Sequence, residues 1–217
     1  MSKKKLALIS SVVVLCLGVA IALIVVRVFF VRLIRVPTGS MMNTIIPGDH
    51  LVVSRIVGEV KRGDIVIFRY PDAPEFFVAR VIGLPGETIQ LQGRSVLIDG
   101  RALDEQRVIV AAMEDSYDPL TELSTEGTGP YRVYYRQRQF EEVMPEESGE
   151  FGTTEPFLIP AASCFLLGDN RDNSYDSRYR GVVPQNLIWG KPTVIYYSAI
   201  LPDEDKVRTE RFFKRVE

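Results

Sequence analysis

The chain has 217 residues, 46% of them hydrophobic, and a formal net charge of −2 at pH 7. This length suggests one or two domains with a substantial core, and the near-neutral charge gives no reason to expect a nucleic-acid partner. The two cysteines, Cys16 and Cys164, lie far apart in the sequence and do not indicate a disulfide framework.

The N-terminus begins with a basic cluster and a long apolar run. Residues 6–26, LALISSVVVLCLGVAIALIVV, carry no charge and follow Lys3, Lys4 and Lys5. As a helix rising 1.5 Å per residue, the run is long enough to cross a bilayer core of roughly 30 Å. A cleavable secretory signal is the alternative, but the run is too long and no small-x-small site follows it. We therefore predict a retained transmembrane anchor at 6–26 and an interfacial juxtamembrane segment at 27–36.

The orientation of this anchor does not follow from charge alone. Residues 1–5 are basic and favour a cytoplasmic start, but Arg27, Arg32 and Arg35 crowd the other end. The positive-inside rule therefore gives no answer.

From residue 50 onward, short runs rich in Val, Ile and Phe alternate with Gly and Pro, which is typical of strands. We predict strands within 50–57, 63–70, 76–84, 88–103, 162–170 and 191–200. Asp99-Gly100 is a good two-residue hairpin turn, because both positions tolerate a positive φ. No long amphipathic helix is evident after residue 36. The fold class is therefore mainly β, an antiparallel domain formed by 37–103 and 157–201.

Two further segments differ in character from this domain. Residues 104–156 are rich in acidic side chains, with a candidate strand in 131–140, and we interpret them as a solvated surface insertion. Within them, 143–152 is expected to be a flexible loop. Residues 202–217 read as a charged C-terminal tail.

A serine directly after a turn signal, in PTGSMMNTI (37–45), is by itself an ordinary loop. Three further stretches follow in order: RGDIVIFRYP (62–71), RVIGLPGE (80–87) and GDNRDNSYDSRYRGVVP (168–184). Together, behind an apolar N-terminal run, they resemble the bacterial type I signal peptidase family.

The resemblance implies a serine endopeptidase that removes signal peptides from exported preproteins. It implies a β-rich catalytic domain whose apolar surface dips into the lipid bilayer. It also implies a single-pass protein of the bacterial inner (cytoplasmic) membrane, with the catalytic domain on the outer, periplasmic side. Signal peptides are the expected partners, with small residues at the first and third places before the cut. No cofactor, metal or nucleic acid is expected.

Carried over onto this sequence, the resemblance assigns roles to individual residues. Ser40 matches the nucleophile, and its backbone N–H together with the hydroxyl of Thr38 matches the oxyanion-stabilising donors. The family often has serine at the place of Thr38, but a threonine hydroxyl has the same donor capacity. Ser174 matches a serine that orients the general base. Asp176 and Arg178 match a supporting pair.

The sequence departs from the family pattern at two positions. Asn43 stands where proline is usual, and we expect it to relax the loop slightly. Ala79 stands where the family has the lysine that serves as general base. A methyl group cannot accept the proton of a serine hydroxyl, so the expected base is missing.

Other groups are weak replacements for this base. Histidine is the usual alternative base because its ordinary pKa lies near neutrality, but His50 follows Ser40 by only ten positions on what reads as the next strand. Arg80 stays protonated. The remaining lysines fall at the N-terminus, in the C-terminal tail or at ordinary surface positions, namely Lys3, Lys4, Lys5, Lys61, Lys191, Lys206 and Lys214.

Three functions remain open from the sequence. The chain is a signal peptidase with a displaced or removed base, an inactive relative that binds signal peptides, or a scaffold within an export complex. Retention of Ser40, Thr38, Ser174 and Asp176 weakens the third.

Overall fold

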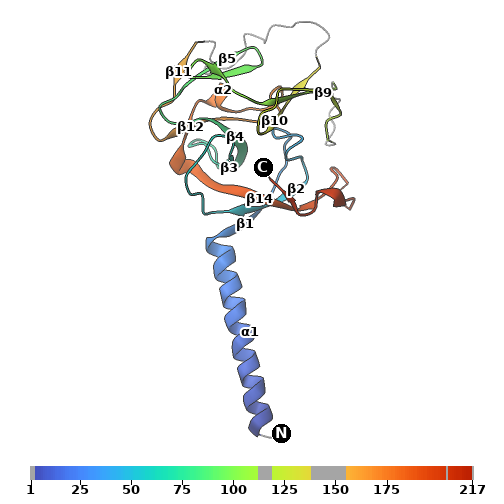
Figure 1. The fold of residues 1–217 in the computed structure, drawn as a ribbon. Helices are drawn as coiled ribbons and strands as arrows, with labels where there is room; N and C mark the ends of the chain where they lie inside the picture. The colour runs from blue at the N-terminus through green and yellow to red at the C-terminus, as the bar shows by residue number, and fades with distance from the viewer. Residues whose placement is uncertain (1–2, 112–118, 138–154, 204, 217) are drawn as a thin grey trace.

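In the computed structural model, residues 3–111, 119–137, 155–203 and 205–216 are described. A long helix, α1 (Lys3–Phe29), extends from one end of a β-rich body (Figure 1). The helix contains the whole predicted segment 6–26. Among the described residues, however, no helix is long and apolar enough to cross a membrane. The predicted transmembrane span is therefore not supported by the structure.

The main sheet has eight strands, and every pair within it is antiparallel. In order along the sheet they are β1 (Val31–Arg35), β2 (Asp49–Ser54), β14 (Ile188–Ser198), β3 (Ile65–Phe68), β4 (Phe77–Gly83), β12 (Ser163–Leu167) and β13 (Val183–Pro184), with β15 (Lys214–Arg215) on β14. The predicted antiparallel, mainly β domain is confirmed.

A four-stranded antiparallel sheet carries the predicted hairpins. It consists of β11 (Phe157–Leu158), β5 (Thr88–Gln92), β6 (Ser95–Ile98) and β7 (Arg101–Ala102). Asp99 and Gly100 join β6 to β7 with φ of 50° and 73°, as the sequence predicts for a two-residue turn.

Residues 104–156 contribute a three-stranded sheet in the order β10 (Arg132–Arg136), β8 (Gln106–Val110) and β9 (Glu122–Glu126). β9 is exposed along its whole length, as expected of a solvated insertion. β8 and β10 are not, because their apolar side chains Val108, Val110 and Val133 pack into the core. The interpretation of 104–156 as a purely solvated insertion is thus wrong for these two strands. The predicted flexible loop at 143–152 lies outside the described residues.

Two other segments also join the main body. The predicted juxtamembrane segment 27–36 contains β1. This strand pairs with β2 and forms one edge of the main sheet. The predicted charged tail 202–217 folds back through η2 (Thr209–Arg211) and β15. Arg211 is buried there against Asp49, with two hydrogen bonds of 3.0 and 2.6 Å that compensate for desolvation of both charges.

The segment that carries Ser40 links β1 to β2, and we call residues 36–48 the serine loop. Its consecutive methionines enter different parts of the core. Met41 packs with Leu51 and Val53 of β2, whereas Met42 packs with Val108 and Val110 of β8. Burying a methionine side chain contributes about 1.5–3 kcal/mol, so this alternation fixes the loop against two sheets at once.

Candidate active site

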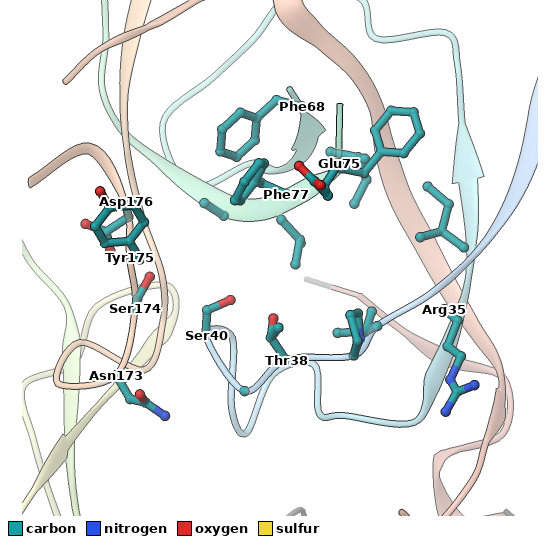
Figure 2. A pocket seen from close by; sticks show the side chains of 18 of the residues that line it. Arg35, Thr38, Ser40, Phe68, Glu75, Phe77, Asn173, Ser174, Tyr175 and Asp176 are labelled. Carbon is teal, nitrogen blue, oxygen red and sulfur yellow. The ribbon is translucent and has the colours of Figure 1, made fainter. Parts of the chain in front are cut away.

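An apolar cavity of about 710 Å³ lies between the serine loop and β4. Figure 2 shows the hydroxyls of Ser40 and Thr38 on one wall, with Phe68, Glu75 and Phe77 on the opposite wall. The segment 172–176 closes one side and brings Ser174 next to Ser40. Ser40, Thr38, Ser174, Asp176 and Ala79 all line this one cavity. The structure therefore brings these candidate residues together from three separate parts of the chain.

Backbone hydrogen bonds hold Ser40 in place. The amide of Asn170 donates to the Ser40 carbonyl at 3.0 Å, and the Asn170 side chain donates to the carbonyl of Gly39 at 2.9 Å. Within the loop, the Met42 amide donates to the same Gly39 carbonyl at 3.1 Å. Ser40 is thus fixed to the segment that follows β12, far away in the sequence.

Gly168 allows Ser174 and Ser40 to approach each other. A Cβ at this position would lie 2.2 Å from the Oγ of Ser174 and 2.5 Å from the carbonyl oxygen of Ser40. No side chain fits in that space without moving the backbone of Ser40. Gly168 stands in the quoted stretch 168–184, but nothing in the sequence indicated its role.

Asp176 and Arg178 form a buried pair behind Ser174. Arg178 donates to both carboxylate oxygens of Asp176, at 2.8 and 2.9 Å, and the amide of Gly168 donates to the same carboxylate at 2.9 Å. Burial by itself would lower the pKa of Arg178, but the charge and hydrogen bonds of Asp176 raise it overall. The carboxylate oxygens of Asp176 therefore accept hydrogen bonds that stabilise the local structure. Asp176 also caps the short helix α2 (Ser177–Arg180).

Ala79 lies in β4, where it pairs with Val66 of β3. It is 3% exposed and packs in a cluster with Phe68, Val81 and Leu166. Its methyl group belongs to the cavity lining. A basic side chain at this position would start in apolar surroundings, which favour a neutral amine.

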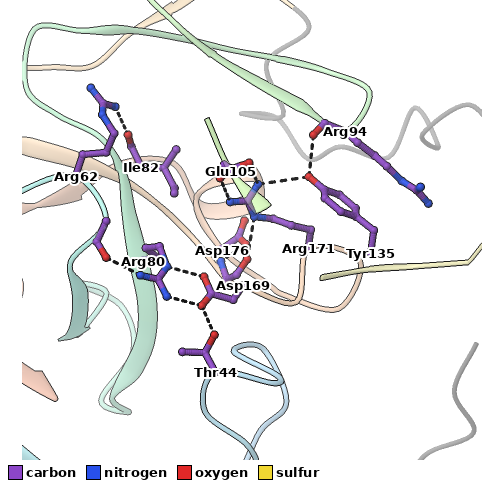
Figure 3. A network of polar contacts seen from close by, with 12 residues as sticks. Thr44, Arg62, Arg80, Ile82, Arg94, Glu105, Tyr135, Asp169, Arg171 and Asp176 are labelled. Carbon is purple, nitrogen blue, oxygen red and sulfur yellow. Dashed lines mark hydrogen bonds and ion pairs between the residues drawn. The ribbon is translucent and has the colours of Figure 1, made fainter. Parts of the chain in front are cut away.

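The next residue in β4, Arg80, joins the two walls of the cavity (Figure 3). Its guanidinium donates to both carboxylate oxygens of Asp169, at 2.8 and 2.7 Å, and both side chains are almost fully buried. Thr44 of the serine loop donates to the same carboxylate at 2.6 Å. Burial opposes the charge of Arg80, but Asp169 outweighs it and the pKa is raised. Arg80 therefore stays protonated, as expected from the sequence.

No lysine or histidine is found among the described residues that line the cavity. His50 lies on the half-exposed side of β2, with its ring against those of Tyr196 and Tyr197. The amine of Lys191 donates to Asp64 at 2.7 Å and to the carbonyl of Glu59 at 2.9 Å. Lys61 is largely exposed. The structure thus brings none of these alternative bases into the cavity.

Within the described part of the chain, no group of three or more His, Cys, Asp and Glu side chains is arranged to hold a metal ion. The polar side chains that line the cavity are hydroxyls and carboxylates, together with the guanidinium of Arg35 and the amide of Asn173.

Comparison with known proteins places these observations in a family. A family model described as signal peptidase, peptidase S26, matches residues 8–197. The chain belongs to this family. Ser40, Ala79 and Ser174, and thus most of the cavity, fall within the matched range.

Relatives named signal peptidase I cover most of the chain. That of Rickettsia prowazekii is 32% identical and covers 81% of this chain and 75% of its own length. That of Pseudomonas aeruginosa is 30% identical, with coverage of 81% and 68%. That of Aquifex aeolicus is 28% identical, with coverage of 85% and 82%.

A crystal structure of a signal peptidase I from Enterococcus faecalis V583 is also similar. It is 27% identical, with a TM-score of 0.38 over 62% of this chain and 97% of that chain.

Sequence reasoning missed several residues that shape the site. Thr44, Glu105 and Arg211 received no role from the sequence. Glu105 pairs with Arg171 at 2.5 and 3.0 Å, both buried, behind the segment that holds Ser40 (Figure 3). The only sequence signal was a polar or charged residue near an apolar run, which is too common to single these residues out.

Proposed function

We propose that this chain is a signal peptidase of the serine endopeptidase type, in which Ser40 attacks the scissile carbonyl of a preprotein. The observation that carries the proposal is the convergence of Ser40, Thr38 and Ser174 on one apolar cavity, which Ala79 also lines. An apolar cavity with a few convergent polar groups is the usual form of a substrate site.

Each residue has a distinct role in this mechanism. The Oγ of Ser40 bonds to the carbonyl carbon, and the electron pair of the C=O bond moves to oxygen. The amide of Ser40 and the hydroxyl of Thr38 donate hydrogen bonds to that developing oxyanion. When the tetrahedral intermediate collapses, the C–N bond breaks, and the amine of the mature protein leaves with a proton. Water then hydrolyses the acyl-enzyme. Ser174 stands where the family has the serine that orients the general base, and with alanine at position 79 it has no amine to orient. Asp176 and Arg178 keep the segment 168–178 in shape.

Among the described residues that line the cavity, none carries an amine or imidazole that could take the proton of Ser40, and the residue at position 79 is alanine. Proton transfer to water is slow at neutral pH because water is a weak base. In serine proteases with a catalytic triad, loss of one triad member still leaves roughly 10³–10⁴-fold catalysis over water, from the oxyanion hole and substrate binding. We expect the chain to cleave signal peptides at a comparable trace level.

A second function follows from the same observation. With the hydroxyl groups and oxyanion-stabilising donors retained but no amine in the described cavity lining, the chain binds signal peptides without cleaving them. It then acts as a receptor for signal-peptide-like segments. Its partners are the same peptides in both cases, and neither function uses a cofactor, a metal or nucleic acid.

The membrane location is also part of the proposal, and its support comes from the sequence. Residues 6–26 are uncharged and follow a basic cluster. We propose a single-pass anchor in the bacterial inner membrane, with residues 1–5 cytoplasmic and 37–217 on the outer side. Protease added to right-side-out spheroplasts is expected to digest the β domain. Complete protection of the domain would contradict this orientation.

The decisive experiment restores the base. Ala79→Lys is expected to raise the rate of preprotein cleavage by about 10²–10⁴-fold, the usual contribution of a general base. The cluster around Ala79 lowers the pKa of a lysine placed there by desolvation. The same variant carrying Ser40→Ala is the control and is expected to be inactive. Rapid cleavage by the unsubstituted chain, lost in Ser40→Ala, would show that another base is present. No gain from Ala79→Lys, with peptide binding intact, would favour the receptor.

A further inference from the structure

We propose that Asn43 is a positioning residue, which fixes Ser40 by tying the serine loop to the sheet of β8, β9 and β10. The sequence suggested the opposite, that Asn43 relaxes the loop. The contact itself is a feature of the fold. Only its expected effect on cleavage rests on the proposed function.

The contact is a pair of hydrogen bonds between one side-chain amide and the backbone N–H and C=O of one residue. The Nδ2 of Asn43 donates to the carbonyl of Leu120 at 3.0 Å, and the amide of Leu120 donates to the Oδ1 of Asn43 at 2.6 Å. The two residues are 77 positions apart in the sequence. Because both bonds use the same planar amide, rotation of the side chain breaks both together. The Asn43 amide thus makes the same donor and acceptor pair with Leu120 that a neighbouring β-strand would make.

Apolar contacts surround this polar link. Met42 and Ile46 of the serine loop are buried together with Leu120. The other members of the same cluster come from the insertion sheet: Val108, Val110 and Tyr134. Because the link is partly buried, water replaces the partners lost on removal of the Asn43 amide only in part.

The same sheet is also linked to Ser40 through β10 and the segment 169–171. The amide of Tyr134 donates to the carbonyl of Asp169 at 2.7 Å, and the amide of Arg171 donates to the carbonyl of Tyr134 at 3.0 Å. Between them, Asn170 donates to the carbonyl of Ser40 at 3.0 Å. Ser40 therefore lies between two attachments to one sheet. Asn43 provides the attachment that follows Ser40 in the chain.

Loss of the Asn43 amide affects geometry more than folding. The apolar cluster and the attachment through Asn170 remain, so the loop stays buried, but it loses the contact that sets its distance from the insertion. A displacement of about 1 Å at a reacting group can cost 10²-fold in rate. Leu120→Ala is the matched comparison. It removes buried side-chain volume while leaving both backbone partners of Asn43 in place, so it acts on stability first.

The first experiment needs no catalysis. Amide hydrogen exchange is measured over residues 38–46 in the otherwise unsubstituted chain, for Asn43→Ala, for Leu120→Ala and for Asn186→Ala, an exposed asparagine in η1 (Gln185–Leu187). We expect Asn43→Ala to speed exchange there about tenfold by local opening, with little change in the unfolding midpoint. Asn186→Ala is expected to change neither quantity. Unchanged exchange over 38–46 in Asn43→Ala would overturn the proposal.

The second experiment uses the Ala79→Lys background and measures kcat and KM for preprotein cleavage. Asn43→Ala is expected to lower kcat about tenfold with KM nearly unchanged, because the reacting geometry is affected and the cavity is not. Leu120→Ala is expected to lower the unfolding midpoint more and kcat less. If kcat falls in proportion to the unfolding midpoint in both Asn43→Ala and Leu120→Ala, the role of Asn43 is purely structural and the proposal is overturned. If Ala79→Lys shows no Ser40-dependent cleavage, the proposed function fails, and the exchange result alone decides the role of Asn43.

Discussion

The two walls of the cavity are built by different kinds of interaction. The serine wall is a loop, and polar contacts from distant segments fix it: Asn170 to Ser40, Asn43 to Leu120 and Arg211 to the carbonyl of Thr44. The β4 wall is a regular strand between β3 and β12, and apolar packing around Ala79 fixes it. A loop has no ladder of its own, so its backbone groups must find partners elsewhere.

This difference explains how the chain can carry alanine at position 79 and still keep the shape of the cavity. On the serine wall, each contact depends on several others, so a single change disturbs the geometry. On the β4 wall, alanine at position 79 fits the sheet and the apolar cluster as it stands. The fold of the β4 wall does not require a basic side chain at position 79, whereas the proton transfer proposed for that wall does.

The largest expected effect concerns Arg80, which joins the two walls. Arg80→Met leaves Asp169 buried without its ion-pair partner, at a cost of about 3–5 kcal/mol in the free energy of unfolding. The measurement is urea unfolding followed by the fluorescence of Trp189, the single tryptophan of the chain. Arg132→Met is the control, because its pair with Glu122 is exposed and is worth about 0–1 kcal/mol. Equal losses of unfolding free energy in Arg80→Met and Arg132→Met would contradict the role of Arg80 in joining the two walls.

A smaller effect is expected from Gly168, which lies under the serine wall. In the Ala79→Lys background, Gly168→Ala is expected to lower cleavage by about 10²-fold, because the added Cβ displaces Ser40 or Ser174. The assay is preprotein cleavage at saturating substrate. Gly18→Ala is the control, since a Cβ there meets nothing within 4 Å. Full activity in Gly168→Ala would mean that the distance between the two serines does not matter.

The smallest expected effect concerns the apolar part of the cavity that the two walls share. Peptides with the pattern Ala-x-Ala are expected to bind about tenfold more tightly than versions with bulky residues at those places, because shallow apolar subsites hold small side chains and leave no room for larger ones. Isothermal titration with the solubilised protein measures this without any cleavage. Equal affinity for both kinds of peptide would remove the argument that the cavity selects small residues.

Local sequence patterns determined most of the strands. The runs at 50–57, 63–70 and 76–84 became β2, β3 and β4, because alternating or continuous β-branched residues fit a buried pleated sheet. The turn at Asp99-Gly100 followed from the backbone freedom of those two residues. The stretches around Ser40, Ala79 and Ser174 indicated a common site, and the structure places them around one cavity.

Only the tertiary structure decided how those stretches are held together. The sequence does not show that Asn43 meets Leu120, that Arg211 meets Asp49, or that Gly168 lets Ser174 approach Ser40, because each contact joins residues far apart in the chain. The burial of Arg211 and of β10 could not be read from composition, since charged and acidic segments are usually solvated. Their burial is stable only because specific partners satisfy their polar groups, and those partners exist only once the sheets have assembled.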